Sequence, residues 1–128
     1  MYLDSSAIAR RLLAEPGWEA FDDFIRASRV RVASELAVTE IRRAILRAGG
    51  SSDLRALADR AFDLIDLVPM TRAILQRAGE LSPAALRTLD AIHLATAMEV
   101  GPVDAFVTYD NRLAEAARRH GLEVAAPS

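Results

Sequence analysis

The first four residues, Met1 to Asp4, form a short predicted strand that runs into a helix without an intervening loop. Ser5 or Ser6 is expected to cap this helix, which continues through residues 7–13. A strand that leads directly into a helix is typical of α/β proteins, in which helices cover a parallel sheet. Asp4 then lies at the carboxyl end of the first strand, the edge of a parallel sheet where ligands bind.

The rest of the chain repeats this alternation. Apolar runs bounded by turn residues predict further strands at 30–33, 64–69, 105–108 and 122–125. Helical periodicity predicts helices at 18–27, 35–48, 51–62, 71–79, 90–100 and 111–120. The pattern indicates a three-layer α/β/α fold with a central parallel sheet of four to five strands. The length of 128 residues fits one domain that spans the whole sequence.

The amino-acid composition excludes several kinds of site and catalytic mechanism. The chain has no cysteine, which excludes disulfides, thiolate zinc sites and cysteine nucleophiles. All 16 basic residues are arginine, so a mechanism that needs lysine is excluded. With a net charge of −2, RNA or DNA would bind only where local arginines or metal ions offset the acids. No apolar run suggests a membrane span or a signal peptide, and we expect a cytoplasmic protein.

Asp90 stands at the start of a helix whose other residues are apolar on every side, within the run Arg87 to Ala97. One interpretation is that this acid lies in the first helical turn, where unpaired N–H groups and the helix dipole favour an anion. The other is that Asp90 helps to bind a divalent cation, together with acids from elsewhere in the chain. The positions of those other acids decide between the two.

Glu40 lies on or beside the buried stripe of the helix at 35–48, three residues after Ala37 and four before Ala44. It is interpreted either as a boundary residue that pairs with Arg43 or Arg47, or as a member of an acidic site.

Four acids are expected at one edge of the sheet. Asp4 and Asp110 each follow a strand, while Asp90 and Glu40 lie on helices that enter from that same edge. Asp104 precedes its strand, which places it about 13 Å away at the opposite edge, and we expect a capping or turn role for it.

Carboxylates that converge without a lysine or a buried arginine repel one another, which raises the pKa of some of them. A divalent cation removes this cost, and a set of hard oxygen ligands suits Mg²⁺ or Mn²⁺. Such ions lower the pKa of a bound water and stabilise the attacking and leaving oxygens of a phosphodiester. The sequence therefore suggests metal-dependent phosphodiester hydrolysis.

Four segments resemble, in order and at family spacing, the motifs of PIN-domain ribonucleases, and the compact length is most similar to the VapC toxins of bacterial toxin–antitoxin pairs. They are the run Tyr2 to Ala7, the helix around Glu40, the run Asp90 to Ala95 and the run Val107 to Leu113. The resemblance covers nearly the whole chain. It implies a PIN-like fold and a Mg²⁺- or Mn²⁺-dependent endoribonuclease that cuts structured cellular RNA such as tRNA or rRNA. It further implies a homodimer that a small VapB-like antitoxin holds inactive.

By motif match, the resemblance implies that Asp4, Glu40, Asp90 and Asp110 form an acidic quartet. Asp4 and Asp90 are the expected direct metal ligands, while Asp110 and Glu40 ligate through water or hold a second ion. Thr108 matches the family's hydroxyl position and would orient a carboxylate or a metal-bound water. The other interpretation of Thr108 is an ordinary β-branched strand residue.

Three more residues have a structural interpretation beside the functional one. Ser6 matches a family hydroxyl, although helix capping also explains a serine there. His93 is interpreted as a packed, hydrogen-bonded helix residue rather than a metal ligand. Arg87 is expected to pair with an acid or to contact phosphate. Arginines near the expected rim are candidates for contacts with the RNA backbone, namely Arg10, Arg11, Arg42, Arg43 and Arg112.

Other classes fit less well. Haloacid-dehalogenase-like phosphatases require a second Asp at the position where this chain has Ser6. These phosphatases and the phospho-receiver domains also commonly use a lysine, which the chain lacks. The alternative from a different class is a non-catalytic PIN-like module that binds RNA or protein.

Inhibition by an antitoxin leads to a physical prediction about the acidic pocket. A basic, arginine-bearing peptide should be able to enter the acidic pocket and neutralise it without metal.

Overall fold

Five short parallel strands form one central sheet in the computed structural model, which describes residues 1–128. The strands are β1 (Tyr2–Leu3), β2 (Val32–Ser34), β3 (Asp66–Val68), β4 (Phe106–Val107) and β5 (Val124–Ala125), in the spatial order β3-β2-β1-β4-β5. All four pairings are parallel. The predicted parallel sheet is confirmed, with β1 at its centre.

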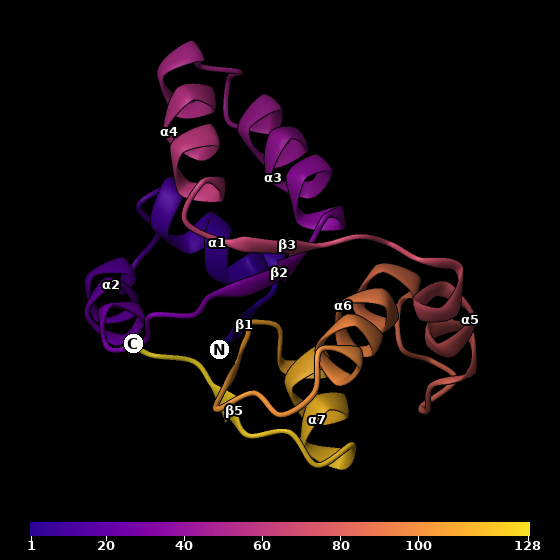
Figure 1. Cartoon of the computed structure of the whole chain (residues 1–128). Coiled ribbons are helices and arrows are strands. Elements are labelled where there is room, and N and C mark those ends of the chain that lie inside the picture. Colours follow the sequence, from indigo (N-terminus) through magenta and orange to yellow (C-terminus); the bar gives the residue numbers. More distant parts are fainter.

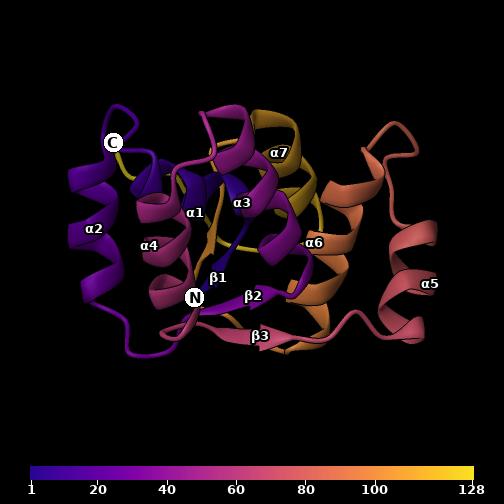
Figure 2. The same ribbon diagram turned by 90° about the horizontal axis from the view of Figure 1, so that it is seen from above.

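Seven helices cover the two faces of this sheet. They are α1 (Ser5–Leu12), α2 (Trp18–Arg26), α3 (Leu36–Arg47), α4 (Ser52–Phe62), α5 (Arg72–Glu80), α6 (Thr88–Glu99) and α7 (Asn111–Arg119). Helices α1 to α4 pack on one face, α6 and α7 pack on the other, and α5 lies on the outer side of α6 (Figures 1 and 2). The three-layer α/β/α arrangement is as predicted.

Side-chain alternation along the two central strands supplies both halves of the core. Leu3 and Val107 point into the cluster beneath α1 to α4, while Tyr2 and Phe106 point toward α6 and α7. The rings of Tyr2 and Phe106 stack with centroids 5.2 Å apart, and these two residues are direct partners in the β1–β4 register. This pairing fixes β1 against β4, so the residues that follow each strand meet at one edge.

Helix α6 is buried all round, as its sequence predicted. Every residue from Ala91 to Ala97 is buried. Leu94 and Ala97 face the sheet and α7, whereas Ala91 and Ile92 face α5. Because α6 lies between the sheet and α5, only its first two turns, with Asp90 and His93, reach the edge where β1 and β4 end.

Two helix starts differ from the prediction. Asp4, not a serine, caps α1: its backbone is extended and its side chain accepts a hydrogen bond from the Ala7 N–H. Because the Asp4 carboxylate accepts this N–H of the first helical turn, the hydroxyls of Ser5 and Ser6 are free to bond with other partners. Helix α3 begins at Leu36, one residue later than expected, and its Leu36 N–H donates a hydrogen bond to the hydroxyl of Ser34, the last residue of β2.

No helix combines the length and the apolar character that crossing a membrane requires.

Candidate active site

Asp4 is held by three hydrogen bonds at the carboxyl end of β1. Its Oδ2 accepts from the Thr108 hydroxyl at 2.6 Å, and its Oδ1 accepts from the Ser6 hydroxyl at 2.7 Å and from the Ala7 N–H at 2.9 Å. The residue is 4 % exposed. Burial raises the pKa of Asp4, and these hydrogen bonds offset only part of that effect. A cation beside this carboxylate would favour its charged form.

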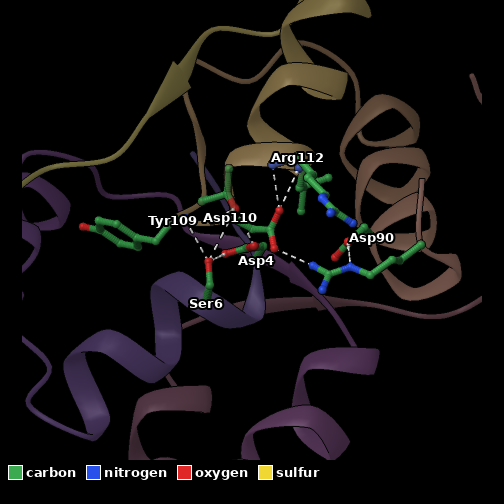
Figure 3. A network of polar contacts seen from close by, with 9 residues as sticks. Asp4, Ser6, Asp90, Tyr109, Asp110 and Arg112 are labelled. Atoms are coloured by element: carbon green, nitrogen blue, oxygen red, sulfur yellow. Dashed lines mark hydrogen bonds and ion pairs between the residues drawn. The ribbon is translucent and has the colours of Figure 1, made fainter. Parts of the chain in front are cut away.

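Thr108 and Ser6 connect the end of β1 to the loop that follows β4. The Ser6 hydroxyl accepts from the Tyr109 N–H at 2.9 Å, and the Thr108 hydroxyl accepts from the Asp110 N–H at 3.1 Å (Figure 3). Thr108 is therefore more than a β-branched strand residue. Its hydroxyl contacts one acid of the predicted quartet directly and the backbone of a second.

Asp90 and Asp110 are brought together by the guanidinium of Arg87. Its Nε donates to Asp90 Oδ2 at 2.7 Å, and its Nη2 donates to Asp110 Oδ2 (Figure 3). The expectation that Arg87 pairs with an acid is confirmed, and it pairs with two. Contact with Asp90 above all raises the pKa of Arg87, which keeps the bridge charged.

Asp110 also begins α7. Its Oδ1 accepts from the N–H groups of Arg112 at 2.9 Å and Leu113 at 3.0 Å, so one oxygen caps the helix while the other contacts Arg87. Burial acts to raise the pKa of Asp110, but the Leu113 N–H and the Arg87 charge outweigh it and lower the pKa. Asp110 is thus held as a carboxylate.

Glu40 is tied to α6 and α1 rather than to the arginines of its own helix. Its Oε1 lies 2.6 Å from His93 Nε2 and accepts from the Ser5 hydroxyl at 2.6 Å. Partial burial acts to raise the pKa of Glu40, but His93 and Ser5 lower it overall. The interpretation that Glu40 pairs with Arg43 or Arg47 is wrong, because α3 turns this side chain inward.

His93 is a packed, hydrogen-bonded helix residue, as expected, and is 2 % exposed. Its Nδ1 lies 2.8 Å from the hydroxyl of Tyr2. Burial raises the pKa of Tyr2, so the phenol keeps its proton and can donate it to Nδ1. An imidazole that accepts this proton at Nδ1 has its own proton on Nε2, where it faces Glu40, so the three side chains would form a directed chain of hydrogen bonds from the core to the site.

The four acids therefore come to the same edge, each with different partners. Asp4 is hydrogen-bonded, Asp90 and Asp110 share a guanidinium, and Glu40 faces an imidazole. No three carboxylate or imidazole groups lie in an arrangement that would hold an ion as the side chains stand. Arg87 occupies the bridging position between two of the acids, so the assignment of the quartet as metal ligands stays a prediction.

The donor chemistry nevertheless fits a hard divalent cation. The groups at this edge are carboxylate oxygens, and two of them already share one cationic group. For an ion to bind between Asp90 and Asp110, the Arg87 side chain has to move away. At 58 % exposure, this side chain is free to do so.

Most of the predicted rim arginines have partners within the chain. The Arg10 guanidinium lies 3.6 Å from the centre of the Tyr109 ring, Arg11 pairs with Asp22 at 2.9 Å, and Arg42 pairs with Asp59 at 2.6 Å. Arg112 instead lines a cleft beside Asp90. Contacts of these arginines with RNA stay predictions.

Sequence reasoning missed the roles of Tyr2 and Ser5. From the sequence, Tyr2 is interpreted only as an aromatic residue of the first strand, and Ser5 only as a possible helix cap. The available signal was strand alternation, which places Tyr2 on the side of α6, where His93 could have been considered as its partner.

Comparisons with known proteins find similar sequences over nearly the whole chain. The family model for the PIN domain matches residues 1–119. Ribonuclease VapC46 of Mycobacterium tuberculosis is 43 % identical over 129 aligned residues, which cover 100 % of this chain and 98 % of the relative. Ribonuclease VapC47 of the same species is 33 % identical, with 99 % of this chain and 96 % of the relative covered.

Solved structures show the same fold. The toxin VapC20 of Mycobacterium tuberculosis, described as cleaving the sarcin-ricin loop, aligns with a TM-score of 0.76 and 19 % identity over 98 % of both chains. A chain of VapBC2 from Rickettsia felis, bound to a DNA fragment from its promoter, aligns with a TM-score of 0.79 and 10 % identity, with 99 % of this chain and 98 % of that chain covered.

Proposed function

Because the chain belongs to the PIN-domain family, and within it to the VapC ribonucleases, we propose that it is an endoribonuclease that hydrolyses phosphodiester bonds in structured cellular RNA. The observation that carries this proposal is the full-length match to proteins named ribonucleases. The arrangement of Asp4, Asp90 and Asp110 at one edge of the sheet supports it. With cellular RNA as substrate, the protein would act in the cytoplasm.

The proposed cofactor is Mg²⁺ or Mn²⁺, held directly by Asp4 and Asp90, with Asp110 and Glu40 as ligands through water or at a second ion. When bound, such an ion lowers the pKa of a water and stabilises charge on the phosphodiester oxygens. The chain's own contribution is orientation. Thr108 and Ser6 fix the Asp4 carboxylate, and His93 fixes Glu40.

The RNA class proposed is tRNA or rRNA. The VapC20 toxin, whose fold is similar, is described as cleaving the sarcin-ricin loop, and a structured loop is the kind of target we propose here. Stems of RNA offer no readable major groove, so target choice would depend on loops and on surface shape. Mapping the ends of cleaved fragments in total cellular RNA identifies the class.

The experiment that tests the function incubates total cellular RNA with the purified chain and Mg²⁺ or Mn²⁺, in parallel with EDTA and with the Asp4→Asn variant. We expect discrete fragments that are absent in both controls. A folded wild-type protein that leaves RNA intact with every ion would contradict the proposal. That result would favour the alternative of a non-catalytic PIN-like module that binds RNA or protein.

We also propose that a small VapB-like antitoxin encoded beside this chain inhibits it. A solved structure of similar fold is described as a toxin–antitoxin complex from Klebsiella pneumoniae. Arg87 shows that a guanidinium fits between Asp90 and Asp110, which is the contact expected of an antitoxin arginine. Adding the cognate partner should abolish RNA cleavage, and replacing its inserted arginine with alanine should restore cleavage. Cleavage that is unchanged by the partner would remove this proposal.

A homodimer is proposed as the form of the free protein, from the family resemblance. Light scattering on the purified chain checks it, with twice the 13.9 kDa chain mass expected. A monomer at every concentration tested would contradict it.

A further inference from the structure

A cleft of about 410 Å³ is lined on one side by Asp90, one of the four acids. One wall is the loop before α6, with Pro83, Leu86 and Arg87, and the other is the exposed side of α7, with Arg112 and Arg119. Arg87 belongs to both sites, since it lines the cleft and contacts Asp90 and Asp110. A ligand that fills the cleft therefore lies next to Asp90 and Asp110.

The α7 wall carries positive charge along one face. Arg112 and Arg119 are seven residues apart, two helical turns, so their side chains leave α7 in nearly the same direction about 10 Å apart. Figure 3 shows the Arg112 side chain extending from the start of α7 toward the side on which Asp90 lies.

These arginines are weakly engaged within the chain. Arg112 makes no ion pair, and it is the Arg112 backbone N–H, not the guanidinium, that donates to Asp110. Arg119 pairs with Glu115 at 2.7 Å, but both side chains are about two-thirds exposed. An exposed pair of this kind contributes little to stability, so a phosphate can compete for the guanidinium. Arg11, by contrast, pairs with the largely buried Asp22, and the Arg10 guanidinium lies over the Tyr109 ring.

We propose that this cleft binds the RNA backbone next to the phosphodiester that is cleaved, with Arg112 and Arg119 contacting successive phosphates. The inference rests on the proposed ribonuclease function and adds where the strand lies. Guanidinium groups bind phosphate oxygens in a two-pronged geometry that suits the backbone. Because the cleft leads to Asp90, a strand that lies in it brings a phosphodiester to the acids.

An acidic peptide fits this cleft less well than RNA. Arg112 and Arg119 could pair with its carboxylates, but the peptide would bring no phosphodiester to the acids at the end of the cleft. RNA supplies both the anion and the bond to be cleaved.

The test uses Asp4→Asn as a background that binds RNA without cutting it. Binding of a fluorescein-labelled single-stranded oligouridylate is measured by anisotropy over a range of salt concentrations, with no partner added. We expect Arg112→Gln and Arg119→Gln each to raise the Kd about three- to tenfold at low salt. Each should also reduce the slope of log K against log salt by about 0.7, the value for one lost phosphate contact.

Arg77→Gln is the matched control, because Arg77 is a partly exposed arginine that pairs with Glu99 at the far end of α6. Its Kd and salt slope should equal those of the background. Equal binding by the background and both α7 variants would overturn the proposal, as would displacement of the RNA by polyglutamate at equal charge concentration.

Failure of this proposal can be told apart from failure of the proposed function. If the wild type cuts cellular RNA and Arg112→Gln and Arg119→Gln cut it equally well, the strand lies elsewhere and the ribonuclease proposal stands. If the wild type cuts no RNA while the α7 variants weaken binding, the cleft binds RNA in a chain that is not a nuclease.

Discussion

The Thr108 hydroxyl donates a 2.6 Å hydrogen bond to Asp4, 104 residues away along the chain. The bond exists because β1 and β4 are neighbours in parallel register, which places the residue after each strand at the same edge. Both side chains are buried, so this hydrogen bond forms where water does not compete.

Replacing Thr108 with Val should lower both stability and activity. The isosteric side chain removes a donor from a buried carboxylate, which we expect to cost about 1–3 kcal/mol in the free energy of unfolding and about tenfold or more in RNA cleavage. Urea denaturation and fragment yield measure the two effects. Thr108→Ser keeps the hydroxyl and should restore cleavage.

Thr96→Val is the control for a structural effect, since the buried Thr96 hydroxyl donates to the Ile92 carbonyl at 2.6 Å within α6. It should lower stability without a specific loss of cleavage. Equal losses of cleavage in Thr96→Val and Thr108→Val would show that Thr108 does not position Asp4.

Replacing Arg87 with Gln should tighten metal binding. The guanidinium occupies the position between Asp90 and Asp110, and its removal leaves two carboxylates that a cation can neutralise. We expect about three- to tenfold tighter binding of Mn²⁺ in calorimetric titration. Arg77→Gln should bind Mn²⁺ as the wild type does, and weaker binding by Arg87→Gln would mean that Arg87 supports the metal site instead of competing with it.

Much of this fold follows from local sequence, and much of the site does not. Turn residues and short apolar runs were enough to find the strands, and the acid that Arg87 is expected to pair with includes Asp90, only three residues along the chain. The contact of Arg87 with Asp110, and that of Glu40 with His93, depend on which strands are neighbours. The spatial order β3-β2-β1-β4-β5 is a tertiary fact that periodicity does not encode.

The start of α1 shows that capping propensity alone does not predict which residue caps a helix. Asp4 and Ser5 are both good N-cap residues, and propensity alone does not choose between them. The choice has chemical consequences, because the cap orients the Asp4 carboxylate and leaves Ser5 free to contact Glu40. Asp4 both caps α1 and belongs to the acidic quartet, and only the structure reveals that one side chain has the two roles.

Replacing Tyr2 with Phe should destabilise the fold by about 1–3 kcal/mol, because His93 Nδ1 loses its buried partner. The free energy of unfolding in urea gives the size of the loss. Imidazole ¹⁵N shifts should show the proton of His93 on Nε2 in the wild type and distributed over both nitrogens in the variant. Tyr109→Phe, in which a partly exposed hydroxyl loses its contact with the Pro127 carbonyl, should cost less. An unchanged ¹⁵N pattern in Tyr2→Phe would contradict the directed chain.

Asp22 should make stability depend on pH below about pH 5. Burial acts to raise its pKa, but Arg11 and Arg26 outweigh it and lower the pKa in the folded state. The unfolded chain therefore binds the proton more tightly, so this contribution is present above the unfolded pKa of about 3.9 and is lost as the pH falls through the folded value. Asp22→Asn should be about 1 kcal/mol less stable than the wild type at pH 7, with a gap that closes toward pH 3. A gap that stays constant or widens in acid would contradict this.

The central claim is that the acids at the carboxyl edge of β1 and β4 cleave RNA, and one rate comparison tests it most directly. Single-turnover cleavage of a mapped RNA fragment with Mg²⁺ is measured for the wild type, Asp4→Asn and Asp104→Asn. Asp104 is the control because it is an acid at the other end of the strands, paired with the Met1 amino group at 2.8 Å. We predict that Asp4→Asn, folded by circular dichroism, is slower by about a hundredfold or more, while Asp104→Asn stays within about twofold. Cleavage by Asp4→Asn at the wild-type rate, or an equal loss in both variants, would contradict the account.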